Sequence, residues 1–439
     1  MPARGTQQLT PLRQEGTILL PIDAFDLDES DVRARHDWAF HRGNIYWLWP
    51  ETAPRAWQDA LSQIEMATRQ ILTAGRATQA LDGRVDDVGI AAYTSGMGPL
   101  LGYWAAEGIL PVTGEVGAVL ELHYRHNTLR MAKLAERTIE AVELIARAGI
   151  AVAVLKGMQT AFSAFPEPGT RPLSDIDLLI DPADREAAGV ALREAGYRPG
   201  RTIPLPPQQC WRMEGTPELS RSLSLVHCDD PWYIDLQTSL DRRYSAGAPM
   251  ITLDLVFGPR TTEEWPISSA GKVLSSPLQV LHLACHASCS FENLRLVRLV
   301  ELALTISKGV KHGSFSWYDF GRVADRAGAL QSAYPALFLT ELLAPGTVCP
   351  TILTRSESQA PDAVRRVVRR LTPTNGQRVL RCSLEERFMW TSSLRGLVRQ
   401  LRHELLPAEM PLRELLWVYR MRAWRVLRGS VTGRAPAGY

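Results

Sequence analysis

The sequence predicts an α+β fold, in which a small mixed sheet with flanking helices is wrapped by N- and C-terminal helical regions. Three observations lead to this prediction. Helical periodicity dominates the first third of the chain, strand-length and helix-length apolar segments then alternate from about residue 150 to 240, and helical periodicity returns beyond Pro277. Such alternation is typical of helices that pack on a sheet.

Composition limits the class of protein. The chain has 439 residues, of which 45% are hydrophobic and 22% charged, so it can bury a large core. Its six cysteines are too few and too irregularly spaced for a disulfide framework. No apolar stretch is long enough to cross a membrane, and the first residues lack a secretory signal. We therefore expect a cytoplasmic protein without integral membrane association.

The N-terminal part of the chain is expected to be helical. Residues 1–20 carry no periodic pattern and are expected to be disordered. An N-terminal helical region then covers residues 21–124, with helices over 28–40 and 56–72 and a glycine-rich break around 94–102. A long amphipathic helix is expected over residues 121–148, ended by Gly149.

The sheet is expected within an α/β domain at residues 125–255. Its strands are predicted at four segments, residues 150–155, 173–180, 222–228 and 232–236. Its helices are predicted at two segments, residues 158–165 and 183–195. A C-terminal helical domain is expected to follow at residues 270–439.

Two aspartates in the second predicted strand are the first candidate site residues. Side chains alternate along a strand, so Asp175 and Asp177 share one face while Ile176, Leu178 and Ile180 pack on the other. Two carboxylates about 7 Å apart repel each other, and a divalent cation removes that repulsion. Oxygen ligands favour Mg²⁺, with Mn²⁺ as the alternative. For an isolated Asp-x-Asp, however, a solvated strand edge is the simpler interpretation.

Neighbouring features favour the metal interpretation. An apolar strand turns through Gly157 into a helix, a geometry that lets backbone N–H groups approach a phosphate. Asp235, on a later strand, offers a third carboxylate, and Arg171 precedes the pair, where it can neutralise a triphosphate. Lys156 has two interpretations: it reaches a phosphate, or it points to solvent or pairs with an aspartate of the next strand.

This order of motifs resembles the nucleotidyltransferase superfamily. More narrowly, it resembles an uncharacterised bacterial nucleotidyltransferase-like family often found in natural-product gene clusters, over about residues 115–430. The family signature is a Leu-Lys-Gly turn, here residues 155–157, and an Arg shortly before Asp-Ile-Asp-Leu-Leu, here Arg171 and residues 175–179. Met158 departs from the Ser or Gly usual in the superfamily, and Gln237 from the His frequent in the family.

The resemblance implies an enzyme that moves a nucleoside monophosphate from an NTP, with ATP expected, to an unidentified acceptor, in the setting of natural-product biosynthesis. It implies that Asp175, Asp177 and Asp235 bind Mg²⁺ and that Asp235 is also the general base. The nucleotide-binding residues would be Lys156, Gly157, Arg171 and Ser174. The expected acceptor is a small molecule, peptide or protein rather than RNA. Two alternatives remain: a non-catalytic NTP-binding scaffold or sensor, and a toxin-like RNA-modifying nucleotidyltransferase.

A histidine- and cysteine-rich helix raises a zinc hypothesis. His282, Cys285, His286 and Cys289 fall on one helical face. His282 and Cys289 are about 10 Å apart along an ideal helix, however, which is too far for one tetrahedral ion. We expect this face to pack against the α/β domain without zinc, with His282 or His286 on the acceptor side.

The C-terminal segment is basic. Residues 361–439 contain 16 Arg, no Lys and 6 acidic residues, a balance of +10 in a chain whose net charge is +2. A basic amphipathic helix over residues 412–427 can lie on an anionic membrane or on RNA. Docking on the acidic remainder of the chain is the favoured interpretation.

Overall fold

The structure, a computed structural model, describes most of the chain between residues 20 and 406 and a few positions beyond. The described residues are 20–24, 26–42, 48–200, 208–240, 258, 261–289, 291, 294–375, 386, 388–391, 393–406, 415–416, 419–420 and 423. The disorder expected for residues 1–20 and the basic helix expected over 412–427 lie, apart from a few positions, outside these residues.

Seven strands form one mixed sheet in the order β3-β4-β5-β2-β1-β7-β6. The strands are β1 (Ala153–Val154), β2 (Asp175–Leu179), β3 (Tyr197–Pro199), β4 (Gln208–Met213), β5 (Tyr233–Gln237), β6 (Thr262–Glu264) and β7 (Lys272–Leu274). Parallel pairing joins β2 to β5 and β1 to β7, and the other neighbours are antiparallel. The small mixed sheet is therefore confirmed. Its strands β1, β2 and β5 lie within or beside three of the predicted segments.

The strand predicted at residues 222–228 is wrong. This segment is a series of bends and turns just before β5. The carboxylate of Asp230 accepts the N–H groups of Arg221 and His227, and the hydroxyl of Ser222 accepts those of Ser224 and Leu225. Side-chain acceptors thus take the backbone donors that a strand would give to its neighbours.

The first third of the chain is helical. It contains α1 (Glu29–Arg42), α2 (Pro54–Ala74), α3 (Val85–Ser95), α4 (Gly98–Ala106) and α5 (Gly114–Arg147). The glycine-rich break expected around residues 94–102 is limited to two residues between α3 and α4. Glycine serves mainly for close packing here, because a Cβ on Gly98 would lie 2.3 Å from the His123 ring and one on Gly102 2.1 Å from the Leu120 carbonyl oxygen.

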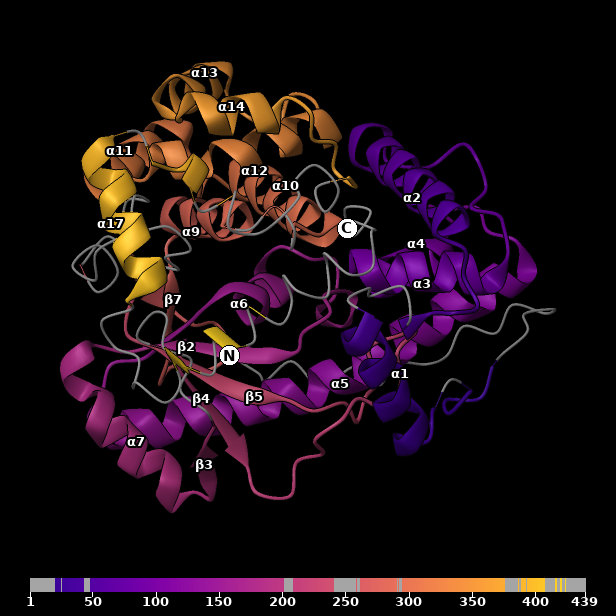
Figure 1. The fold of residues 1–439 in the computed structure, drawn as a ribbon, viewed down its shortest axis with the longest axis horizontal. Coiled ribbons are helices and arrows are strands. Elements are labelled where there is room, and N and C mark those ends of the chain that lie inside the picture. Colours follow the sequence, from indigo (N-terminus) through magenta and orange to yellow (C-terminus); the bar gives the residue numbers. More distant parts are fainter. Residues whose placement is uncertain are drawn as a thin grey trace, which may run out of the picture.

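Two helices, α6 (Lys156–Ser163) and α7 (Arg185–Glu194), connect the strands, and the helicity expected beyond Pro277 is found throughout the described C-terminal part. The C-terminal helices are α9 (Ser276–Ser288), α10 (Leu296–His312), α11 (Trp317–Ala327), α12 (Leu330–Leu343), α13 (Pro350–Gln359), α14 (Asp362–Val368) and α17 (Leu394–Leu405). In Figure 1 these helices lie above the sheet, α5 and α7 lie below it, and α2, α3 and α4 lie to the right. Among the described residues, no helix combines the length and apolar character needed to cross a membrane.

The two faces of the sheet have different partners. Ile176, Leu178 and Ile180 are buried in a core with α5 and α7, as the alternation along β2 predicts. From the opposite face, Leu155 and Leu179 belong to a second core built with α9, α10, α11 and α12. The acidic residues of β2 and β5 lie on this second face, toward the C-terminal helices.

Candidate active site

Three carboxylates from two adjacent strands converge on one face of the sheet. β2 and β5 run parallel with Asp177 opposite Asp235 and Asp175 opposite Tyr233. One carboxylate oxygen from each of Asp175, Asp177 and Asp235 lies within 4.8 Å of the others. Asp175, at the start of β2, is partly exposed, whereas Asp177 and Asp235 are buried. The cluster is thus open to solvent at one end and enclosed at the other.

Asp177 is held by two donors that the protein itself supplies. Lys156 Nζ lies 2.5 Å from Asp177 Oδ1, and Gln237 Nε2 donates to the same oxygen at 2.5 Å. Both donors are buried. The structure therefore shows Lys156 paired with an aspartate of the next strand, and its contact with a phosphate remains a prediction. Gln237, noted from the sequence only as a departure from the family pattern, lies two residues beyond Asp235 and so on its face.

Lys156 also has an unusual backbone. Among the described residues it is the one non-glycine residue with positive φ, at 48°. This left-handed conformation costs about 1 kcal/mol or more for a residue with a Cβ. It is the first residue of α6, and the preceding Leu155 N–H donates to the Asp177 carbonyl at 3.0 Å. The turn therefore places the ammonium group at the carboxylate at the expense of local strain.

Gly157 lies where the turn enters α6. A Cβ at this position would lie 2.0 Å from Leu173 Cδ2 and 3.5 Å from Arg171 Nη2. Close packing against the segment that leads into β2 is therefore sufficient reason for glycine here. The phosphate-binding role expected for Gly157 remains a prediction.

Arg171 forms a buried ion pair with Glu301 of α10. Its Nε and Nη2 donate to the two Glu301 oxygens at 3.0 and 2.9 Å, and the side chains are 12% and 4% exposed. The Thr160 hydroxyl of α6 also donates to Glu301. The guanidinium thus connects the segment before β2 to α10, and its contact with a triphosphate remains a prediction. No local sequence pattern points to Glu301, which lies 130 residues from Arg171.

Ser174 precedes the acidic pair and is exposed. Its hydroxyl donates to Asp175 Oδ1 at 3.3 Å. The residue is therefore at the open end of the cluster, and its nucleotide-binding role remains a prediction.

The carboxylates affect two neighbours on the same face of the sheet. Burial raises the pKa of the Tyr233 hydroxyl, and Asp175, Asp235 and Asp177 raise it further. Cys210 lies opposite Asp235 on β4, and burial and the Asp235 charge raise the pKa of its thiol. Both side chains are therefore neutral near pH 7. The sequence could have placed Tyr233 here, because it is two residues before Asp235 on the same strand.

Arg130 of α5 fixes the approaches to both acidic strands. Its Nε donates to the Leu173 carbonyl at 2.7 Å, and its Nη1 and Nη2 donate to the carbonyls of Asp230 and Pro231 at 2.6 and 2.8 Å. These carbonyls precede β2 and β5. One buried guanidinium therefore stabilises the alignment in which Asp177 lies opposite Asp235.

The histidines of α9 are not part of the acidic cluster. His282 is buried, and its ring centroid is 6.3 Å from that of His286. Leu278 and Leu281 of the same helix pack with Leu155 and Leu179 of the sheet region, as expected for a helix docked on the α/β domain. Among the described residues, neither histidine belongs to a group of three ligands close enough to share a metal ion. Their place on the acceptor side and the expected absence of zinc remain predictions.

The donor set fits a divalent cation. Three carboxylates within 4.8 Å repel one another, and one lysine and one amide offset part of this charge at Asp177. Oxygen ligands around a partly open position suit a hard cation that keeps water and substrate phosphate in its coordination shell. The three carboxylates thus form a possible acidic metal site.

A mixed sheet, a glycine turn, paired acids on one strand and a third acid on a later strand are what the resemblance to nucleotidyltransferases implies. The structure adds that the two acidic strands are parallel neighbours. A family model described as uncharacterised nucleotidyltransferase matches residues 91–345. This is more than half of the chain, which therefore belongs to this family. The match starts nearer the N-terminus than the resemblance that we traced over about residues 115–430. It also stops earlier, at residue 345. Comparisons with curated proteins and with solved structures find no match.

Proposed function

We propose that this protein is a Mg²⁺-dependent nucleotidyltransferase that moves a nucleoside monophosphate from an NTP to an acceptor hydroxyl. ATP is the expected donor. The acceptor is expected to be a small molecule, a peptide or a protein, in a biosynthetic setting. The family supports nucleotidyl transfer in general. The observation that carries the proposal is the convergence of three carboxylates from β2 and β5 beside the turn into α6.

Each carboxylate has a distinct role in this proposal. Asp175 and Asp177 would hold Mg²⁺, with Asp235 completing the site from the parallel strand. The bound metal would neutralise charge on the attacking and leaving oxygens. Asp235 is buried between β2 and β4, so an acceptor hydroxyl that approaches the cluster meets its carboxylate away from bulk water. It would take the hydroxyl proton as the oxygen attacks the α-phosphorus and pyrophosphate leaves.

Two cationic residues and one amide have positioning roles. Lys156 keeps Asp177 in place through the 2.5 Å contact, and Gln237 fixes the same oxygen from β5. Arg171, with Gly157 beside it, faces the entrance to α6, where a triphosphate would gain from both the guanidinium and the helix N-terminus. Because Arg171 also holds Glu301, its charge is fixed in position before nucleotide arrives.

The Asp235→Asn variant distinguishes a catalytic role of this carboxylate from a role in binding metal and nucleotide only. The variant should keep its affinity for ATP with Mg²⁺ within a few-fold and lower nucleotide transfer by roughly 10²-fold, the scale of a positioned base. Affinity is measured by calorimetry. Transfer is measured as incorporation of α-labelled ATP into an extract of the cells that naturally produce the protein.

Asp229→Asn is the matched control. Asp229 is close in sequence to Asp235, but its carboxylate is exposed and pairs with Lys133 at 2.5 Å. This variant should transfer nucleotide at the wild-type rate. Wild-type transfer by Asp235→Asn would refute the proposed mechanism. ATP binding without transfer or pyrophosphate release in the wild type would instead identify a nucleotide sensor.

A further inference from the structure

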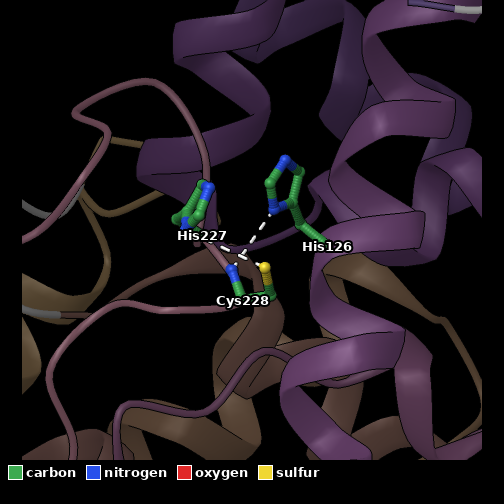
Figure 2. A group of neighbouring side chains, drawn as sticks. All are labelled: His126, His227 and Cys228. Carbon is green, nitrogen blue, oxygen red and sulfur yellow. Dashed lines mark hydrogen bonds between the residues drawn. The ribbon is translucent and has the colours of Figure 1, made fainter. Parts of the chain in front are cut away.

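A second cluster of metal-binding side chains lies outside the acidic site. His126 of α5 meets His227 and Cys228 of the loop before β5, with one ligand atom from each within 4.8 Å of the others. Figure 2 shows the two imidazoles and the sulfur converging from these two elements. The ring centroids are 4.3 Å apart, and Cys228 Sγ lies 3.9 Å from His227 Nδ1. Two ligands of a tetrahedral zinc ion are about 3.3–3.7 Å apart, given the usual Zn–N and Zn–S bond lengths.

The outer nitrogens of both histidines are already oriented. His227 Nε2 donates to Asp26 Oδ1 at 2.7 Å, and His126 Nε2 donates to the Ile22 carbonyl. Each ring therefore carries its proton on Nε2, and its Nδ1 lone pair accepts a backbone N–H, that of Cys228 at His126 and that of Asp229 at His227. A histidine that binds metal through one nitrogen usually donates the other N–H to a carboxylate or a carbonyl, and both partner types occur here.

Burial fits a closed site with one accessible side. His126 and His227 are 1% and 4% exposed, whereas Cys228 is partly exposed. Solvent can thus supply a fourth ligand at the thiol side. Two imidazoles and a thiolate suit zinc better than the hard cation expected at the carboxylates.

We propose that His126, His227 and Cys228 bind a zinc ion. The ion would connect three parts of the chain: α5, the loop that leads into β5, and the segment around residues 22–26 that holds the outer nitrogens. The same loop contains Asp230, whose carbonyl is held by Arg130. With solvent as its fourth ligand, zinc here fixes the start of the strand that carries Asp235.

Binding changes two hydrogen bonds. Without zinc, the Cys228 N–H donates to His126 Nδ1 at 3.2 Å and the Asp229 N–H donates to His227 Nδ1 at 3.0 Å. When zinc binds, the two Nδ1 lone pairs coordinate the ion instead. The Cys228 thiol releases its proton to solvent as the thiolate binds. The released Cys228 N–H lies beside the sulfur of its own side chain, and a thiolate is a strong acceptor.

Metal content tests the assignment. Protein purified without chelator, and chelated protein reloaded with zinc and dialysed, should both hold about one zinc per chain by elemental analysis. Cys228→Ser and His227→Gln should lower zinc affinity at least tenfold. Cys349→Ser, at a partly buried free cysteine elsewhere, and Asp177→Asn, in the acidic cluster, should retain the ion. No zinc in the reloaded wild type, or undiminished zinc affinity in Cys228→Ser, would overturn the proposal.

Thiol protection gives a second test that needs no variant. Zinc should slow alkylation of Cys228 by iodoacetamide at least tenfold, and a chelator should restore it, because a metal-bound thiolate is shielded. Cys349 in the same sample should react equally in both conditions. Peptide mapping by mass spectrometry distinguishes the two thiols. If zinc is retained while Cys228 reacts at an unchanged rate, the ion is bound elsewhere and the assignment fails.

Discussion

Asp177 lies at the centre of a small charge network. Its Oδ1 contacts the ammonium group of Lys156, the first residue of α6, and an amide from β5, both buried. A buried ion pair contributes little when compared with apolar residues, but removing one partner is costly because the other charge stays buried. In the absence of metal, loss of either Lys156 or Asp177 would therefore leave the other charge buried without its ion-pair partner.

Asp177→Asn should lower the metal-free free energy of unfolding by about 1–3 kcal/mol, because Lys156 loses its charged partner. Mg²⁺ with ATP should raise the melting temperature of the wild type, and the variant should lose this increment. Urea unfolding and thermal scans measure the two effects.

Asp175→Asn is the control for this prediction. Asp175 is partly exposed, so its variant should also lose the response to Mg²⁺ with ATP but keep more of the metal-free stability. Equal or higher metal-free stability of Asp177→Asn would show that repulsion among the carboxylates outweighs the Lys156 pair.

The sequence predicted the acidic residues better than their partners. Alternation along a strand is a local rule, so it placed Asp175 and Asp177 on one face and predicted the packing of Ile176 on the other. From carboxylate repulsion alone, Asp177→Asn would be neutral or stabilising. The contact with Lys156 reverses this expectation, and it depends on a strained φ that no local pattern indicated.

The entry into α6 and the entry into β2 are packed against each other. Gly157 belongs to the first and Leu173 to the second, and the missing Cβ of Gly157 leaves the space that Leu173 Cδ2 occupies. Leu173 is itself buried, so it has little room to move. The glycine therefore sets the distance between the helix and the strand that carries the acidic pair.

Gly157→Ala should destabilise the protein by roughly 1–3 kcal/mol, because the added methyl group overpacks this contact. The cost should be smaller in a Leu173→Ala background, giving a coupling energy above about 0.5 kcal/mol in a double-mutant cycle. Urea unfolding of the four proteins measures it.

Gly114→Ala is the matched control for the glycine. It lies at the start of α5 with nothing within 4 Å of an added Cβ, and should be neutral or slightly stabilising. Strictly additive effects of Gly157→Ala and Leu173→Ala would show that steric contact is not the reason for glycine at position 157.

Elements were predicted where the apolar pattern is strong. Strands β2 and β5 are almost fully buried, and the apolar residues in their sequences indicate this burial. Strands β3 and β6 are three residues long and largely exposed, so they carry no periodic signal. The false strand at residues 222–228 has the apolar residues of a strand, but its backbone donors bind Asp230 and Ser222, which composition alone does not reveal.

At the scale of the whole molecule, the sheet depends on distant parts of the chain. Helix α5 runs through residue 125, the expected start of the α/β domain, and β6 and β7 lie beyond residue 255, its expected end. Strand β7 is the parallel neighbour of β1. The core on the acidic face is completed by α9, α10, α11 and α12. The sequence marked a change of periodicity near these boundaries, but periodicity does not show which elements share a core.

A fragment limited to residues 125–255 should therefore not unfold cooperatively. It lacks β7 and the C-terminal helices, so the face that holds Leu155 and Leu179 would be exposed to water. Circular dichroism during urea titration measures cooperativity, with residues 20–406 as the control. A sigmoidal transition of the short fragment would contradict this prediction and support an independent α/β domain.

The ion pair between Arg171 and Glu301 has an evolutionary consequence. Loss of Glu301 would leave the Arg171 charge without its partner in a largely buried position. Because Arg171 belongs to the family signature, Glu301 should be retained wherever Arg171 is present in an alignment of the family, although 130 residues separate them. The exposed pair of Lys133 and Asp229 carries no such penalty, so its two positions should vary independently.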